Sequence, residues 1–260
     1  MKRNLVFIGA GNVAHHLLPA LKGAGCHVLQ VVNRSAAKAK WLAEMNEADW
    51  TSDLAKVNPH ADLYVFSISD DALEGAVSLV NPTGKLVIHT SGSTPLEMLK
   101  KYTDRCGVIY PFQTLTRSRE INFREVPLFV EGSSPEVENF LLSLARDLSD
   151  QVEAMDSRKR MILHLSAVIA GNFSNHMVVR AWELLRAEGI PFDLLHPLIL
   201  ETARKATEMN PVDAQTGPAV RLDKMIMERH KALLNQYPEL QKLYTFVSDS
   251  ISRFHQENRD

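Results

Sequence analysis

The sequence has few cysteines and almost no excess of either charge. Cys26 and Cys106 are its only two cysteines, and they form no Cys-x-x-Cys pair. We expect both to be free thiols that pack as small hydrophobic side chains in a reducing compartment. The formal net charge is -2 over 260 residues, so no overall positive field would attract nucleic acid or an anionic membrane. Neither is therefore expected as a partner.

The sequence also lacks an apolar run long enough to cross a bilayer, a signal peptide and any cluster with metal-ligand spacing. These absences predict a cytoplasmic protein that holds no metal. What remains is an ordinary globular composition, 45% hydrophobic and 23% charged. The length suits one large domain or two small ones.

A glycine-rich turn follows the first predicted strand. Residues 5–8 are apolar, residues 9–14 read Gly-Ala-Gly-Asn-Val-Ala, and a helix-forming segment follows. In this order Gly9 permits a tight turn and Gly11 lets the backbone approach a pyrophosphate, while Ala14 lets the helix pack closely on the strand. The start of the helix adds free N–H groups and a partial positive charge. The pattern predicts a dinucleotide site; the alternative is a structural turn without a ligand. The predicted ligands in this turn are Gly9, Ala10, Gly11, Asn12 and Val13.

The end of the second predicted strand, residues 27–32, bears on which nicotinamide cofactor binds. An acidic residue there would accept hydrogen bonds from the ribose of NAD, but this sequence has Asn33, Arg34 and Ser35, with Lys38 following. A guanidinium and small donors suit the extra phosphate of NADP, since charge-assisted hydrogen bonds are worth about 1.5–3 kcal/mol each. We therefore predict NADP. The alternative is that Arg34 is solvated and Ser35 only caps the next helix.

Polar residues follow the next predicted strands at their carboxyl ends, where open parallel sheets bind ligands. We expect Ser69 and Thr90 to border the cofactor, and Ser91 with Gly92 to hold the polar end of a substrate. Gln113 is a further candidate for substrate binding. The alternatives are hydroxyl groups that only cap a helix and an ordinary loop glutamine. Residues 117–125 are charged and irregular and predict an exposed excursion or lid.

The second half of the sequence changes character. Residues 127–132 predict a strand, residues 135–148 a helix and residues 151–155 an edge strand, whereas only helical patterns follow Asp156. We therefore predict an α/β Rossmann domain over residues 1–155, with a mostly parallel, doubly wound sheet. An all-α domain is predicted over residues 156–260.

The first helix of that second half carries an unusual set of polar residues. Residues 161–179 are apolar nearly all round, as in a helix buried within a bundle or between domains. His164, Asn172 and Asn175 fall within an arc of about 80°, with Gly171 between them. Because unpaired buried polar groups cost about 1–3 kcal/mol, this stripe predicts the wall of a site. His164 and Asn172 are candidate catalytic residues and Asn175 a candidate substrate ligand; the alternative is hydrogen bonding to neighbouring helices or across a dimer interface.

Residues 8–14 followed by residues 32–35 resemble the N-terminal domain of pyrroline-5-carboxylate reductases and deazaflavin-dependent NADP oxidoreductases. The whole chain more closely resembles a bacterial family that joins such a Rossmann domain to a helical domain of unassigned function. That likeness rests on residues 89–93, 110–114 and 216–223, and on His164 with Asn172. It implies a 6-phosphogluconate dehydrogenase-like C-terminal domain and, usually, a homodimer.

The related 3-hydroxyacid dehydrogenases carry a catalytic lysine one turn before an asparagine on this helix. Here that position is Val168, and His164 is the available substitute because an imidazole titrates near neutral pH. We predict an NADP-dependent oxidoreductase that moves hydride between NADPH and a small C=O or C=N substrate. Two alternatives remain: a non-catalytic NADP-binding scaffold or redox sensor acting through a dimer or partner interface, and a nucleotide-binding transferase with another cofactor.

Overall fold

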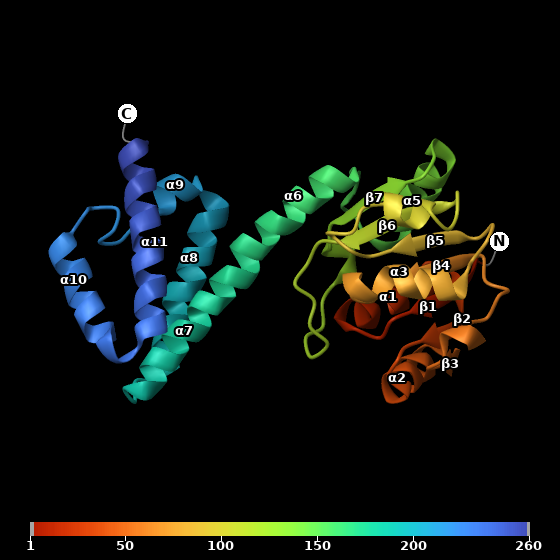
Figure 1. The fold of residues 1–260 in the computed structure, drawn as a ribbon, viewed down its shortest axis with the longest axis horizontal. Helices are drawn as coiled ribbons and strands as arrows, with labels where there is room; N and C mark the ends of the chain where they lie inside the picture. Colours follow the sequence, from red (N-terminus) through yellow and green to blue (C-terminus); the bar gives the residue numbers. More distant parts are fainter. Residues whose placement is uncertain (1–2, 259–260) are drawn as a thin grey trace. The chain divides into compact units, whose positions relative to one another are not determined.

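The computed structural model describes residues 3–258, which form two compact units divided between Asn172 and Phe173. The first unit is built on one eight-stranded sheet with the strand order β3-β2-β1-β4-β5-β6-β7-β8 (Figure 1). The strands are β1 (Arg3–Ile8), β2 (Cys26–Val32), β3 (Asp49–Thr51), β4 (Leu63–Phe66), β5 (Leu86–His89), β6 (Cys106–Pro111), β7 (Leu128–Gly132) and β8 (Val152–Ala154).

The sheet is mostly parallel, and only β6 and β7 pair antiparallel. The chain runs from β1 outward to β3 and then returns to β4 on the other side of β1. This reversal creates a switch point between β1 and β4, where the crevice beyond the strand ends is open to a ligand. The predicted Rossmann-type sheet is confirmed.

Helices cover both faces of the sheet, because successive side chains of β1 pack against helices on opposite faces. Leu5 and Phe7 pack with α1, α2 and α5, whereas Val6 and Ile8 pack with α3 and α4 on the opposite face. Four fully buried residues in succession are what a strand covered on both faces requires. The helices of this unit are α1 (Asn12–Gly23), α2 (Ala36–Asn46), η1 (Leu54–Lys56), α3 (Asp70–Val80), α4 (Glu97–Lys100), η2 (Phe123–Glu125), α5 (Pro135–Leu148) and α6 (Ser157–Ala167).

Arg160 fixes the first turn of α6 to the sheet domain. Its guanidinium is 1% exposed and forms an ion pair with Glu131. It also donates to the carbonyl oxygen of Thr94 at 2.6 Å, and the Leu96 N–H donates to Ser157 Oγ at 2.9 Å. Removing one partner from such a buried pair leaves an uncompensated charge, so the interaction holds the helix in place. The first compact unit accordingly continues past the last strand.

The second unit is helical, and residues 173–258 contain no strand. Only Ala219, Leu234 and Ser248 are buried among these residues. A π-helical segment, η3 (Val168–Phe173), joins α6 to the helix that begins this unit. The helices that follow are α7 (Ser174–Ala187), η4 (Phe192–Leu195), α8 (His196–Glu208), α9 (Pro211–Ala214), α10 (Lys224–Leu233), η5 (Leu234–Gln236) and α11 (Pro238–Glu257).

Two expectations about the long helix Ser157–Ala187 are wrong. Its apolar middle is not buried in the chain, since Ile162, Leu165 and Ile169 are each more than half exposed. The helix is also long and apolar enough to cross a membrane by length and composition, with 31 residues and a mean hydropathy of 1.2 over its best window. The expectation that no run is long enough to cross a bilayer failed because scattered polar residues interrupt the apolar stretch but lower its mean hydropathy only slightly. Those polar groups are themselves costly in hydrocarbon, so composition is weak evidence for insertion.

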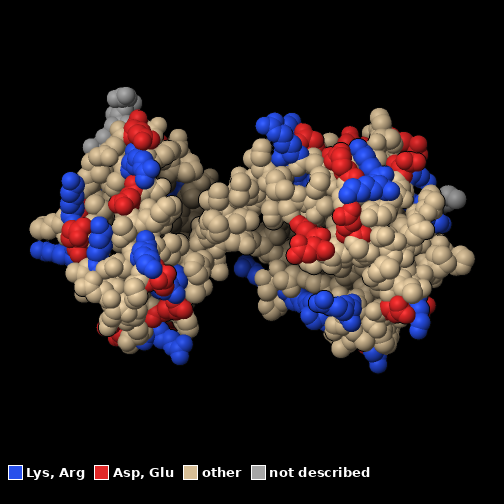
Figure 2. Space-filling model, in the orientation of Figure 1, with Lys and Arg blue, Asp and Glu red and all other residues tan. Residues whose placement is uncertain are grey.

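The surface carries charges of both signs. In the view of Figure 2, Lys and Arg side chains are interspersed with Asp and Glu over the visible face. This distribution matches the formal net charge of -2. Cys26 and Cys106 are both free and buried, as expected.

Candidate active site

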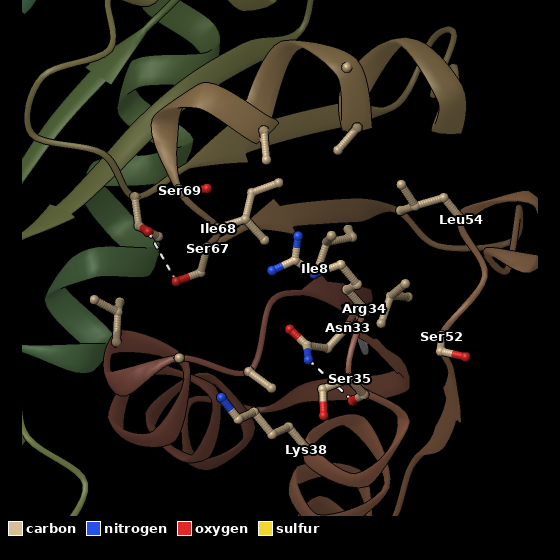
Figure 3. Close-up of a pocket in the computed structure, with 18 of the residues that line it drawn as sticks. Ile8, Asn33, Arg34, Ser35, Lys38, Ser52, Leu54, Ser67, Ile68 and Ser69 are labelled. Carbon is tan, nitrogen blue, oxygen red and sulfur yellow. Dashed lines mark hydrogen bonds between the residues drawn. The ribbon is translucent and has the colours of Figure 1, made fainter.

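A cavity of about 1010 Å³ lies beyond the carboxyl ends of the central strands. Its volume is at the upper end of the range for small-molecule and cofactor sites. Figure 3 shows Asn33, Ser35 and Lys38 on one side of it and Ser67, Ile68 and Ser69 on another. The predicted cofactor residues that line it are Ala10, Gly11, Asn12, Val13, Asn33, Arg34, Ser35, Ser69 and Thr90.

The glycine-rich turn has the shape that close approach of a ligand requires. Gly9 does not line the cavity; a Cβ there would lie 2.0 Å from the Ser67 carbonyl oxygen, and its φ of +124° is unfavourable for other residues. A Cβ on Gly11 would meet no atom within 4 Å, so the space beside it is open. Gly11 is also the N-cap of α1, and the first turn of that helix has no acidic residue. The turn therefore fits the phosphates of a dinucleotide.

The end of β2 offers cations and a free hydroxyl. Ser35 occupies the N-cap position of α2, but its side chain makes no capping hydrogen bond. Asn33 Nδ2 donates to the Ser35 carbonyl oxygen at 3.2 Å, which stabilises the turn. Arg34 and Lys38 line the cavity and form no ion pair with any described residue. This donor set fits the additional phosphate of NADP.

Hydroxyl groups connect the ends of β4 and β5. Thr90 Oγ1 donates to Ser67 Oγ at 3.2 Å. Ser91 lines the cavity, and its Oγ accepts from the N–H groups of Ser93 at 3.1 Å and Thr94 at 2.9 Å. Ser91 thus shapes the loop that borders the cavity, in addition to any contact with a substrate.

His164 lies against this loop. Its Nδ1 is 3.0 Å from the Tyr110 hydroxyl, and a Cβ added to Gly92 would lie 2.7 Å from the same nitrogen. Only glycine therefore lets the imidazole come this close to the loop. Burial raises the pKa of Tyr110, while the charge of Arg160 opposes the shift. The phenol consequently stays protonated at neutral pH and can donate a hydrogen bond to Nδ1.

A second histidine lies behind the loop and is fully buried. His89 Nδ1 accepts from the Ser91 N–H at 3.1 Å. Burial, reinforced by the charge of Arg160, lowers the pKa of His89 to about 3. His89 is therefore neutral at physiological pH and supports the loop.

The predicted site residues that do not line the cavity are Gly9, Gly92, Gln113, His164, Asn172 and Asn175. Gln113 is exposed, and its Oε1 accepts from the Thr114 N–H at 2.8 Å. Asn172 and Asn175 are also exposed, which contradicts the expected burial of their helix face, and Asn175 belongs to the second unit. Sequence reasoning missed Arg117, which lines the cavity, and did not pair Tyr110 with His164. Arg117 is 107 residues from Ala10, to which it donates, and Tyr110 is 54 residues from His164. No local sequence pattern joins residues so far apart.

Comparisons with known proteins agree with this architecture. Residues 2–112 match the model of a Rossmann-like domain, and residues 126–251 match Domain of unknown function (DUF2520). No curated protein matches the sequence. An imine reductase from Myxococcus stipitatus, solved with NADP+, has a TM-score of 0.68 at 18% identity, covering 98% of this chain and 93% of its own. A 1-pyrroline-5-carboxylate reductase from Streptococcus pyogenes has a TM-score of 0.60 at 15% identity, covering 97% and 99%. At these identities the likeness shows the fold.

A crystal structure from Bacteroides fragilis is much more similar. That protein, provisionally assigned as an NADP oxidoreductase, is 42% identical with a TM-score of 0.92, and the match covers 97% of this chain and 98% of the other. The resemblance drawn from the sequence is thereby confirmed. The chain belongs to the same family as the Bacteroides fragilis protein and carries a Rossmann-like domain followed by Domain of unknown function (DUF2520).

Proposed function

We propose that the chain is an NADP-dependent oxidoreductase that transfers hydride between NADPH and a small compound with a C=O or C=N bond. The continuity of one cavity carries this proposal. Its lining extends from Arg34 and Lys38, past Gly11, to Ser91, next to the glycine that His164 contacts. The names of the relatives support it: one is assigned as an NADP oxidoreductase, and two are reductases of C=N compounds.

Each part of the cavity has a separate task in this proposal. Arg34, Ser35 and Lys38 bind the extra phosphate of NADP through charge-assisted hydrogen bonds, and the start of α1 binds the pyrophosphate. The bound nicotinamide supplies or accepts the hydride. In the reducing direction the hydride adds to the substrate carbon, and His164 donates a proton to the substrate oxygen or nitrogen. Tyr110 holds the imidazole, and Ser91 with the Gly92 backbone holds the polar end of the substrate.

Turnover of the His164→Ala variant tests this assignment. NADPH consumption is measured with a panel of small cyclic imines and oxo acids. Loss of the proton donor is expected to lower turnover by about 10²–10⁴-fold, while NADPH affinity stays near that of the wild type. Ser166→Ala is the matched control, because Ser166 lies on the same helix and donates only to the Ile162 carbonyl oxygen, at 2.9 Å.

Unchanged turnover in His164→Ala would remove this residue from the chemistry. NADPH binding by the wild type without consumption across the whole panel would favour the non-catalytic scaffold or redox sensor instead.

We further propose a soluble, cytoplasmic homodimer. The carrying observation is the near absence of a core in the helical unit, where Ala219 and Leu234 are the only buried apolar residues of the described range 173–258. Phe173, Leu198 and Phe246 are each more than half exposed. Many large apolar side chains exposed on one unit are typical of an interaction surface, and a second copy would present the same surface to it.

A further inference from the structure

We infer that residues 113–122, between β6 and η2, form a strap over the cofactor cavity and that Arg117 binds the pyrophosphate of the dinucleotide. This inference rests on the dinucleotide function proposed above. The position of Arg117 supports it. This side chain follows the glycine-rich turn by more than a hundred residues, yet it donates to the Ala10 carbonyl oxygen inside that turn. It also lines the same cavity as Gly11 and Asn12.

The strap is attached on both sides of Arg117. The Thr116 carbonyl oxygen is 3.1 Å from His16 Nε2 on α1. Further along, Ile121 and Phe123 pack against the hydrophobic core, and the Phe112 N–H donates to the Pro127 carbonyl oxygen at 2.8 Å where the excursion begins and ends. These contacts hold the guanidinium at the turn and limit its motion, which reduces the entropy lost when it binds a ligand.

The charge of Arg117 has no ionic partner within residues 3–258. Asp53 and Asp71 line the same cavity, but neither forms an ion pair with it. Burial lowers the pKa of His15 in α1, and the charges of His16 and Arg117 lower it further. A cation next to a helix N-terminus that already favours anions creates a strong preference for a negatively charged ligand.

The guanidinium also has spare donors. It carries five N–H groups in a planar fork, so donation to Ala10 leaves others for phosphate oxygens, which such a fork can bind in pairs. The pyrophosphate is common to NADPH and NADH, whereas the extra phosphate assigned to Arg34 is present in NADPH alone. Arg117 should therefore contribute to the affinity for both cofactors without distinguishing between them.

The experiment compares NADPH and NADH dissociation constants of the full-length wild type with those of three variants. Arg117→Ala is expected to weaken both cofactors by the same factor, about tenfold or more, because it removes a charge-assisted hydrogen bond. Arg34→Ala is expected to weaken NADPH alone. Arg119→Ala is the matched control, since Arg119 is exposed on the same strap and has no side-chain bond to a described residue; it should bind both cofactors as the wild type does.

A protease that cuts after glutamate gives a second readout, because Glu120 is exposed on the strap. NADPH should slow cleavage there in the wild type and in Arg119→Ala but not in Arg117→Ala. If Arg117→Ala does not fold, Arg117→Lys replaces it. That variant keeps the charge and loses the fork, and severalfold weaker binding of both cofactors is expected.

Wild-type affinity for both cofactors in Arg117→Ala, or in Arg117→Lys where it is used, overturns the inference. Weakening of NADPH alone also overturns it, since Arg117 would then act on the extra phosphate. A wild type that binds neither cofactor is a different result, because it refutes the proposed dinucleotide function itself.

Discussion

Gly9 and Gly92 show how a missing side chain shapes this site at the scale of single residues. A Cβ on Gly9 would overlap the Ser67 carbonyl group, and one on Gly92 would overlap both His164 and Tyr110. The first glycine was recognisable from its motif, because dinucleotide turns place it there. The second became meaningful only once the fold had brought Tyr110 and His164 to it. Contacts of this kind cannot be derived from local sequence patterns.

His89 provides a prediction about pH at the same scale. Its pKa of about 3 in the folded chain lies below the ordinary value near 6.5. The unfolded chain therefore binds more protons between these values, so stability is fully present above about pH 6.5 and falls as the pH is lowered. We expect His89 to account for a loss of about 1.4 kcal/mol in the free energy of unfolding per pH unit in that window.

Urea unfolding of the wild type and of His89→Asn from about pH 7 to pH 5 measures this loss. Asparagine keeps an acceptor for the Ser91 N–H but does not titrate, so the pH dependence of the variant should be flatter by that amount. Equal slopes for the two proteins would show that folding does not lower the pKa of His89.

At the scale of elements, the strands were the most predictable features of the chain. Residues 63–66, for example, are apolar at four consecutive positions, which is typical of a strand buried on both faces. The edge strand near residues 151–155 and the helix over residues 135–148 also occur as expected, as β8 and α5. These elements are fixed by local periodicity and by capping residues, which the sequence displays directly.

The helix that carries residues 161–179 was predictable from its sequence pattern, but its environment was not. Its apolar composition indicates that some surface covers it, yet composition cannot say which surface. Its middle is π-helical around Gly171 and Asn172, a local irregularity that is frequent at functional sites and has no distinctive sequence signal. Leu222 is a smaller case, because it adopts a φ of +57°, which is unfavourable for a residue with a side chain.

At the scale of the whole molecule, the exposed apolar residues predict a dimer. A 31-residue helix is about 46 Å long, enough for an extensive interface between two copies. We expect the wild type to sediment at twice the chain mass at micromolar concentration. Replacing Leu165 and Ile169, one turn apart and both more than half exposed, with glutamate should shift it to the monomer, because two charges would be buried without partners.

Met45→Glu is the control for that experiment, since Met45 is an exposed apolar residue of α2 and should leave the sedimentation unchanged. A wild type that sediments as a monomer at the same concentration would contradict the proposed dimer and would leave the apolar helix faces for a different partner.

The central claim is that the cavity beyond the glycine-rich turn binds NADP. Parallel fluorescence titrations of the wild type and of Arg34→Ala with NADPH and NADH test it most directly. The wild type is expected to bind NADPH about tenfold or more tightly than NADH, the difference of one charge-assisted hydrogen bond, and Arg34→Ala should lose that preference while retaining affinity for NADH. Tighter binding of NADH by the wild type, or an unchanged preference for NADPH in Arg34→Ala, would contradict the assignment.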